Sequence, residues 1–327
     1  MCEKKSPEKE IHWSEKKEVA KSSSPITFMI FLVKIFPHWF LALIAVPVGF
    51  FYFVFSSAAR KECKTYQRNV IDFGKKKNLP TIKRVNSFRQ ILSFALCLVE
   101  KVEGWCGKLK LKQVIFQDDS ILELKNQLSQ GKGALLIGSH LGNIELLRCL
   151  ASEGKTGVEK NVPVTSIMDV NVTANFNKSM EKINSKAYLD VIPADKIGID
   201  TIEILQDRIN QGGLVVTAGD RTSSSNPQRS IDADFLGKSA AFPYGSFFLA
   251  SLLNAPVYFV FALRTKSFSL RSKYKMIVKK IDVDFNCSRA EKKNRCTQLC
   301  RSYAAFLENY CLSYTFQWYN FYNFWAK

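Results

Sequence analysis

The chain has 327 residues, of which 46% are apolar, so it can fill the core of one large α/β domain or two small ones and is not a disordered chain. Its formal net charge is +18, and residues 57–112 hold 14 Lys and Arg against 4 Asp and Glu. Such a basic block suits nucleic acid, anionic lipid headgroups or an acidic carrier protein, unless it is only a solvated face. Nine scattered cysteines suit a reducing compartment, and three histidines are too few for a zinc site.

The N-terminal region contains the longest uncharged stretch of the chain. Residues 1–24 mix Lys, Glu and Ser with little to bury, which predicts a mobile tail. Residues 35–59 carry no charge and exceed the roughly 20 residues that cross a bilayer. Two prolines and a glycine leave a straight span, a bent or re-entrant segment and a buried core helix as alternatives. The basic block that follows predicts a body that faces the cytoplasm. We therefore predict a tail (1–24), a membrane anchor segment (25–59) and a cytoplasmic domain (60–327).

Beyond the anchor, the hydrophobic pattern predicts regular elements. Residues 82–102 have helical periodicity and suit an amphipathic helix beside the body or the membrane. Short apolar runs then alternate with helical segments. The expected strands are residues 134–138, 164–168, 189–192, 214–218, 256–263 and 273–283. The expected helices are residues 143–152, 173–186, 200–210 and 289–312. This alternation predicts an α/β fold with a mostly parallel central sheet flanked by helices, preceded by an N-terminal membrane helix.

One histidine stands where such folds bind their ligands. His140 follows the strand at 134–138, and Gly142 and Asn143 mark a turn before the next helix. On one continuous helix His140 and Glu145 would lie about 140° apart, but they meet if only Glu145 is helical. Glu145 would then hold one imidazole nitrogen while the other takes a proton. A core histidine beside a helix-capping glutamate is the alternative.

A second polar pair follows a second strand. Asp220 and Arg221 come directly after residues 214–218, so two neighbouring strand ends would form one cleft. Arg221 suits a phosphate group or a developing oxyanion, and a local Asp/Arg salt bridge is the alternative. Lys238 is a further phosphate candidate. The aromatic stretch at residues 317–325 suits either a membrane interface or a cap on the core.

These motifs resemble a known family. Residues 133–146, which contain His140 and Glu145, look like the His-x4-Asp/Glu block of the lysophospholipid acyltransferase superfamily. Within it the chain is most similar to the bacterial lipid A biosynthesis lauroyl/myristoyl acyltransferase family. Further matching segments occur in the same order: Trp13, Glu18 and residues 218–221, 234–238, 242–245, 249–250 and 255–257.

The resemblance implies a transferase at the inner membrane that moves a fatty acyl group from a thioester to a hydroxyl or amine of a membrane lipid or glycolipid. The donor would be acyl carrier protein or coenzyme A, with no tightly bound cofactor and no metal. His140 would be the general base and Glu145 its partner. The expected substrate-binding residues are Asn143, Asp220, Arg221 and Lys238. The alternative is a non-catalytic membrane protein that keeps the fold and binds anionic lipid through the basic block. No nucleic-acid-binding motif appears.

Overall fold

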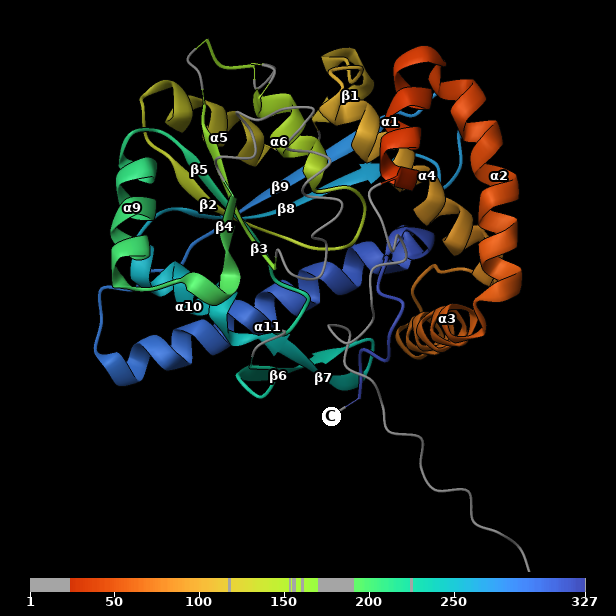
Figure 1. The fold of residues 1–327 in the computed structure, drawn as a ribbon. Coiled ribbons are helices and arrows are strands. Elements are labelled where there is room, and N and C mark those ends of the chain that lie inside the picture. Colours follow the sequence, from red (N-terminus) through yellow and green to blue (C-terminus); the bar gives the residue numbers. More distant parts are fainter. Residues whose placement is uncertain are drawn as a thin grey trace, which may run out of the picture.

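A seven-stranded sheet forms the centre of the protein (Figure 1). The computed structural model describes residues 24–116, 119–152, 154, 157–159, 162–169, 191–223 and 226–326. The strand order is β1-β9-β8-β2-β5-β3-β4, and β8 and β9 are the one antiparallel pair. The strands are β1 (Val114–Phe116), β2 (Ala134–Gly138), β3 (Val164–Met168), β4 (Val191–Pro193), β5 (Leu214–Ala218), β8 (Val257–Arg264) and β9 (Tyr274–Ile281). The predicted mostly parallel α/β fold is confirmed.

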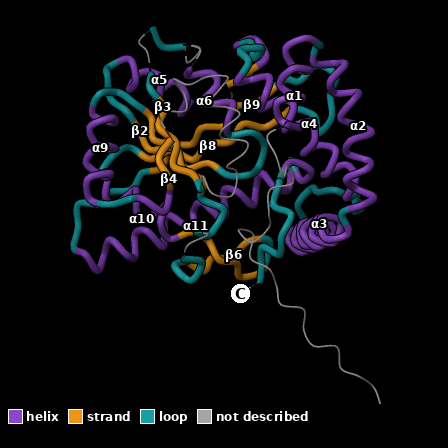
Figure 2. Tube along the Cα trace, in the orientation of Figure 1, coloured by secondary structure: helices purple, strands orange, loops and turns teal. Residues whose placement is uncertain are grey.

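Helices cover both faces of this sheet, as Figures 1 and 2 show. The elements outside the sheet are α1 (Ser24–Ile35), α2 (His38–Phe55), α3 (Ser57–Lys77), α4 (Ser87–Trp105), α5 (Asp119–Ser129), α6 (Glu145–Ser152), α9 (Ile199–Asn210), α10 (Tyr244–Leu253), α11 (Arg289–Ser313) and the hairpin of β6 (Ser230–Phe235) and β7 (Lys238–Pro243). Helices α5 and α6 pack on one face, and α9, α10 and α11 pack on the other. The expected helix at 173–186 and the tail at 1–23 lie outside the described residues.

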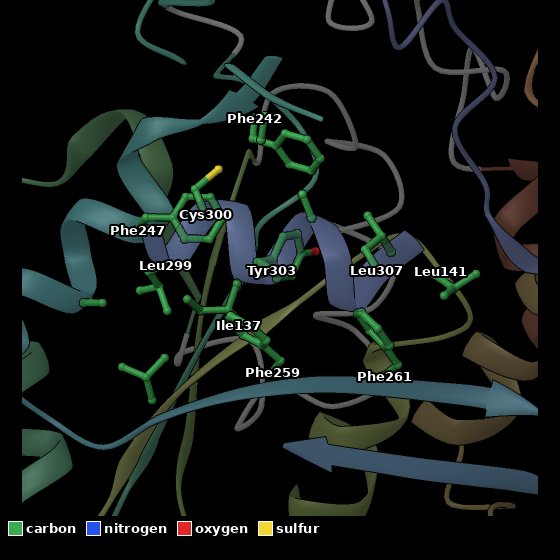
Figure 3. Packing of buried hydrophobic residues seen from close by; sticks show 14 of the residues in the cluster. Ile137, Leu141, Phe242, Phe247, Phe259, Phe261, Leu299, Cys300, Tyr303 and Leu307 are labelled. Carbon is green, nitrogen blue, oxygen red and sulfur yellow. The ribbon is translucent and has the colours of Figure 1, made fainter. Parts of the chain in front are cut away.

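The central strand β2 is buried on both sides, which explains its uninterrupted apolar sequence. Leu135 and Ile137 belong to the core under α10 and α11, whereas Ala134 and Leu136 belong to the core under α5 and α6. Successive side chains of a strand point to opposite faces, so both faces of β2 need apolar residues. Tyr303 of α11 lies among these side chains in Figure 3 and donates a hydrogen bond from its hydroxyl to the Gly138 carbonyl at 2.6 Å.

The predicted membrane anchor segment, residues 25–59, forms α1, α2 and the start of α3 rather than one helix. Helix α1 ends at Ile35, and α2 begins after Pro37, whose extended backbone caps the new helix. Among the described helices, α2 is long and apolar enough to cross a membrane, with a mean hydropathy of 1.9. It packs along α4 at one side of the sheet, where the added Cβ of a residue at Gly49 would contact Leu92 at 3.4 Å (Figure 1).

Candidate active site at the ends of strands β2 and β5

Two parallel strands deliver His140 and Asp220 to the same edge of the sheet. Strands β2 and β5 are in register, with Gly138 opposite Ala218, and His140 and Asp220 each stand two residues beyond these positions. The Gly219 amide donates to the Gly138 carbonyl at 2.8 Å, which extends the pairing past the strand ends. The expectation that both strand ends contribute to one site is therefore met, since carboxyl ends of parallel strands meet at one edge.

Asp220 holds one nitrogen of the His140 imidazole. His140 Nδ1 lies 2.8 Å from Asp220 Oδ1, and the His140 backbone amide donates to Asp220 Oδ2 at 2.9 Å. The Trp318 indole and the Asn320 amide each donate to the same Oδ2 at 3.2 Å. A carboxylate that accepts several hydrogen bonds stays ionised, so it fixes the proton of the imidazole on Nδ1. Nε2 is thereby left as the nitrogen that accepts a proton.

Burial and charge set the protonation of this pair. Burial, together with the charge of Arg221, lowers the pKa of His140, although Asp220 acts in the opposite direction. Burial alone would raise the pKa of Asp220, but the charge and hydrogen bonds of His140 and the charge of Arg221 outweigh it and lower that pKa. The Asp220 side chain is 0% exposed and that of His140 is 31% exposed. The imidazole of His140 is therefore neutral near pH 7 and partly exposed, whereas the Asp220 carboxylate is fully buried.

A glycine makes the turn after His140 possible. Gly142 has φ +78°, and a Cβ at this position would lie 2.2 Å from the Ala262 carbonyl oxygen at the end of β8. The Asn143 amide donates to that carbonyl at 2.8 Å, and the Gly142 amide donates to the Gln317 carbonyl at 2.9 Å. Only a residue without a side chain combines this backbone conformation with so close an approach. The turn is thus fixed between β8 and the C-terminal segment.

The C-terminal segment forms one wall of the site. The Tyr319 amide donates to the His140 carbonyl at 3.0 Å. Arg221 Nε donates to Asn320 Oδ1 at 2.8 Å, and its terminal nitrogen donates to the Tyr319 carbonyl at 3.1 Å. Trp318 and Tyr319 are buried. Of the two alternatives for the aromatic stretch, the structure shows a core cap that also holds Asp220 and Arg221.

Glu145 takes a different partner from the one that we expected. Its carboxylate lies 3.1 Å from Arg148, one helical turn along α6, and no hydrogen bond among the described residues joins it to His140. Glu145 is the first residue of α6, as the geometric argument required. The imidazole position nevertheless goes to Asp220, because β5 places that carboxylate level with His140. The expected hydrogen bond is therefore not made in this structure.

Of the two remaining predicted site residues, Asn143 lies near His140 and Lys238 contacts a different part of the protein. Asn143 is 3% exposed, and neither polar atom of its side chain has a hydrogen-bond partner in the described part of the chain. It lies in the turn after His140. Lys238, at the start of β7, instead donates to Asn69 of α3 at 2.8 Å. No contact of Lys238 with His140 or Asp220 occurs among the described residues.

Sequence reasoning missed the residues that complete the site. Trp318 and Asn320 hold Asp220 from a segment about a hundred residues away, and no spacing motif reveals such a contact. A polar Asn320 within an aromatic stretch was the one available signal. Within the described residues, no group of three or more His, Cys, Asp and Glu side chains is arranged to bind a metal ion. The arrangement suits proton transfer at Nε2 of His140.

A comparison with known protein families identifies the family of this chain. Residues 16–325 match the family described as bacterial lipid A biosynthesis acyltransferase. The chain belongs to this family. It is an acyltransferase, and the family implies a lipid-type acceptor. The match spans nearly the whole chain, so it includes the sheet edge with His140 and Asp220, helices α1–α4 and the C-terminal segment. A search of curated proteins found no matching relative.

Proposed function

We propose that the protein transfers a fatty acyl group from a thioester to a hydroxyl or amine of a membrane lipid or glycolipid, with His140 as the general base. The observation that carries this proposal is the imidazole held through Nδ1 by the buried Asp220 carboxylate, which leaves Nε2 to accept a proton. The partner that the sequence suggested, Glu145, would have to leave Arg148 to reach His140. We therefore assign the role of partner to Asp220.

The chemistry needs no bound cofactor. Nε2 of His140 removes the proton of the acceptor hydroxyl while the acceptor oxygen attacks the thioester carbonyl carbon. Asp220 stabilises the imidazolium that forms. When the tetrahedral intermediate collapses, the carbon–sulfur bond breaks and the imidazolium returns the proton to the leaving thiolate. Arg221 and the unpaired amide of Asn143 lie beside this centre and are the proposed substrate-binding groups. Lys238 has no such support.

The donor is an acyl thioester of acyl carrier protein or coenzyme A. The excess of Lys and Arg over residues 57–112 supports an acidic carrier protein, because opposite charges accelerate association. Purified protein in detergent, supplied with each donor and a bacterial lipid extract, tests the function directly. We expect a new acylated lipid by mass spectrometry and a loss of about 10²- to 10⁴-fold in rate for His140→Ala.

The same experiment separates the enzyme from a non-catalytic lipid-binding protein. That second candidate predicts no acyl transfer, and lipid binding that depends on the basic block rather than on His140. If folded His140→Ala kept the rate of the parent protein within a few-fold, the assignment of the base would be wrong. Neutralising exposed lysines of α3 supplies the comparison, because these residues have no contact with His140 among the described residues.

We further propose that α2 lies along one leaflet of the cytoplasmic membrane, with the catalytic edge on the cytoplasmic side. His38, at the start of α2, hydrogen-bonds Glu103 of α4 at 2.7 Å. At the other end, Phe53 packs beside Ile91, near the start of α4. Both ends of α2 are thus tied to the catalytic domain, which argues against opposite sides of a bilayer. Its outward apolar side chains are Trp39, Leu43, Val48, Phe50, Phe51, Val54 and Phe55.

Protease protection tests this orientation. An epitope tag at the N-terminus, before residue 24, would remain protected in right-side-out membrane vesicles if α2 stays in one leaflet. Digestion of the tag from outside, with the catalytic domain intact, would show that α2 crosses the membrane. The apolar outward face supplies the binding energy at about 25 cal/mol per Å² of apolar surface buried.

A further inference from the structure

Lys101 lies on the face of α4 that packs against the His140 turn. Cys97, four residues earlier, places its Sγ 3.8 Å from the Gly142 carbonyl oxygen. Gly104, three residues later, packs so closely on α6 that a Cβ there would lie 2.8 Å from Cys149 Sγ. Positions four and seven residues apart share one face of a helix, so Lys101 shares the face of its two neighbours. Consistent with this position, its charge contributes to the lowered pKa of His140.

The ammonium group of Lys101 has no counterion among the described residues. The two glutamates beside it on α4 are engaged elsewhere: Glu100 lies 3.5 Å from Arg264, and Glu103 lies 2.7 Å from His38. The two carboxylates nearest to His140 in the chain and in space are also engaged, Glu145 by Arg148 and Asp220 by His140. A partly buried cation without an anion nearby is unfavourable, and an anionic ligand would relieve it.

A second, independent observation points to a ligand at the same place. Asn143 follows Gly142, against which Cys97 of α4 packs, and its side chain is 3% exposed. Both polar atoms of its amide lack a hydrogen-bond partner in the described part of the chain. An unpaired buried amide costs about 1–3 kcal/mol, and native proteins retain few of them. A ligand oxygen that accepts from Asn143 Nδ2 and from the Lys101 ammonium group would satisfy these two donors.

We propose that Lys101, together with Asn143, forms a phosphate-binding subsite beside His140. This proposal rests on the proposed acyl transfer and adds the chemical class that the site recognises next to the reacting atoms. An ammonium group and an amide N–H group are both donors, which suits a phosphate oxygen. Two sources share this chemistry: a phosphate on the acceptor headgroup, and the phosphate of the phosphopantetheine arm that acyl carrier protein and coenzyme A both carry. Lys101 is a binding residue and takes no part in the proton transfer.

Steady-state kinetics of Lys101→Gln, Lys101→Arg and the control Lys293→Gln test the subsite. Lys293 is an exposed lysine of α11, outside the basic block at residues 57–112. We expect Lys101→Gln to raise KM for the phosphate-bearing substrate about tenfold to a hundredfold, the range of one charge-assisted hydrogen bond. Lys101→Arg should recover most of the loss. Lys101→Gln should also move the acid limb of kcat/KM to higher pH, because it removes a cation that lowers the pKa of His140. A purely structural role would not move that limb.

Substrates without phosphate identify the source. An acyl N-acetylcysteamine thioester lacks the donor phosphate, and a dephosphorylated acceptor lacks the headgroup phosphate. The KM effect of Lys101→Gln should vanish with one of these two substrates, which names the partner group. Equal effects on all substrates, or behaviour identical to Lys293→Gln, would overturn the subsite. If His140→Ala abolishes transfer while Lys101→Gln is neutral, the subsite alone fails; if His140→Ala is neutral, the proposed base fails.

Discussion

Two pairs of ionisable side chains contact the C-terminal segment, and they differ in exposure. In the pair of His140 and Asp220, the imidazole is 31% exposed and the carboxylate 0%. In the pair of Arg264 and Glu100, both side chains are at most 3% exposed. Tyr319 connects the two, since its amide donates to the His140 carbonyl and its hydroxyl accepts from Arg264 at 2.6 Å.

This difference in exposure distinguishes a pair that can exchange a proton with a substrate from a pair that only stabilises the fold. The closed pair, Arg264 and Glu100, holds the end of β8 against α4, because Arg264 also donates to the Ser93 carbonyl and hydroxyl at 2.6 Å. Its groups reach no solvent and so cannot exchange a proton with a substrate. The half-open pair is that of His140 and Asp220. Its carboxylate is as buried as that of Glu100, but its imidazole is partly exposed. The pair of Arg264 and Glu100 therefore stabilises the fold around the site, and in the pair of His140 and Asp220 the carboxylate positions the proposed base.

The largest expected effect is on the half-open pair. Asp220→Asn removes the carboxylate that fixes the imidazole tautomer, so we expect kcat to fall on the order of 10³-fold or more with the fold retained. Glu145→Gln should lose less, because Glu145 pairs with Arg148. Measured kcat values for both variants, with circular dichroism as the folding control, check this order. An equal or larger loss in Glu145→Gln would return the role of partner to Glu145.

Breaking the closed pair should affect stability rather than chemistry. Arg264→Met leaves Glu100 buried without its cation, which costs about 3–5 kcal/mol. Replacing both partners in Arg264→Met/Glu100→Leu should recover a large part of this loss, since no charge is then left buried. Denaturant midpoints of the two variants measure the difference. A double variant that is no more stable than Arg264→Met would show that the pair itself is not the source of the effect.

A pair of glycines distinguishes the site from an ordinary turn. Gly142 and Gly131 both have positive φ, +78° and +77°, but a Cβ at Gly131 meets no atom within 4 Å. Gly131→Ala should therefore cost only the left-handed strain of about 1–2 kcal/mol. Gly142→Ala adds the clash with the Ala262 carbonyl and should lower both the unfolding midpoint and kcat. Identical unfolding midpoints and kcat values for the two variants would contradict the importance of that close approach.

The sequence predicts the strands better than the contacts that make the site. Strands β2, β3 and β5 match their expected ranges residue for residue, because buried parallel strands are short, continuous apolar runs bounded by polar turns. Because these strands alternate with helices, the sequence pattern alone predicts that His140 lies at a strand end. The antiparallel pairing of β9 with β8 is not visible in periodicity, because both kinds of strand alternate their side chains in the same way.

Two of the elements that the sequence analysis did not predict share a cause. Helix α3 is strongly basic and the hairpin of β6 and β7 is short, so neither has a long apolar run. The hydrogen bond of His140 with Asp220 is hard to predict for a related reason: Glu145 is close in the chain, whereas Asp220 is close only after β2 and β5 pair. A spacing motif reports sequence distance, and tertiary pairing decides between two nearby carboxylates.

The smallest expected effect is a pH shift that depends on the pair of His140 and Asp220 and not on the pair of Arg264 and Glu100. Burial lowers the pKa of His140 from its ordinary 6.5, so the base form persists below pH 6.5 and the acid limb of kcat/KM should fall below that value. The unfolded chain binds the proton of His140 more readily, so this group makes the fold less stable as pH falls below 6.5. Asp220, whose pKa is also lowered, adds stability above its ordinary 3.8 that is lost as pH falls further.

Both groups therefore act in the same direction, and each makes the fold less stable as pH falls. Kinetic pH profiles of the parent protein, Asp220→Asn and Arg264→Met sharpen the comparison of the two pairs. Asp220→Asn removes the group that raises the pKa of His140, so its residual activity should show an acid limb at lower pH than the parent protein. Arg264→Met should leave the limb in place, because no hydrogen bond among the described residues joins Arg264 directly to His140, and Tyr319 lies between them. A limb that moves equally in both variants would mean that the closed pair also controls the charge of the base.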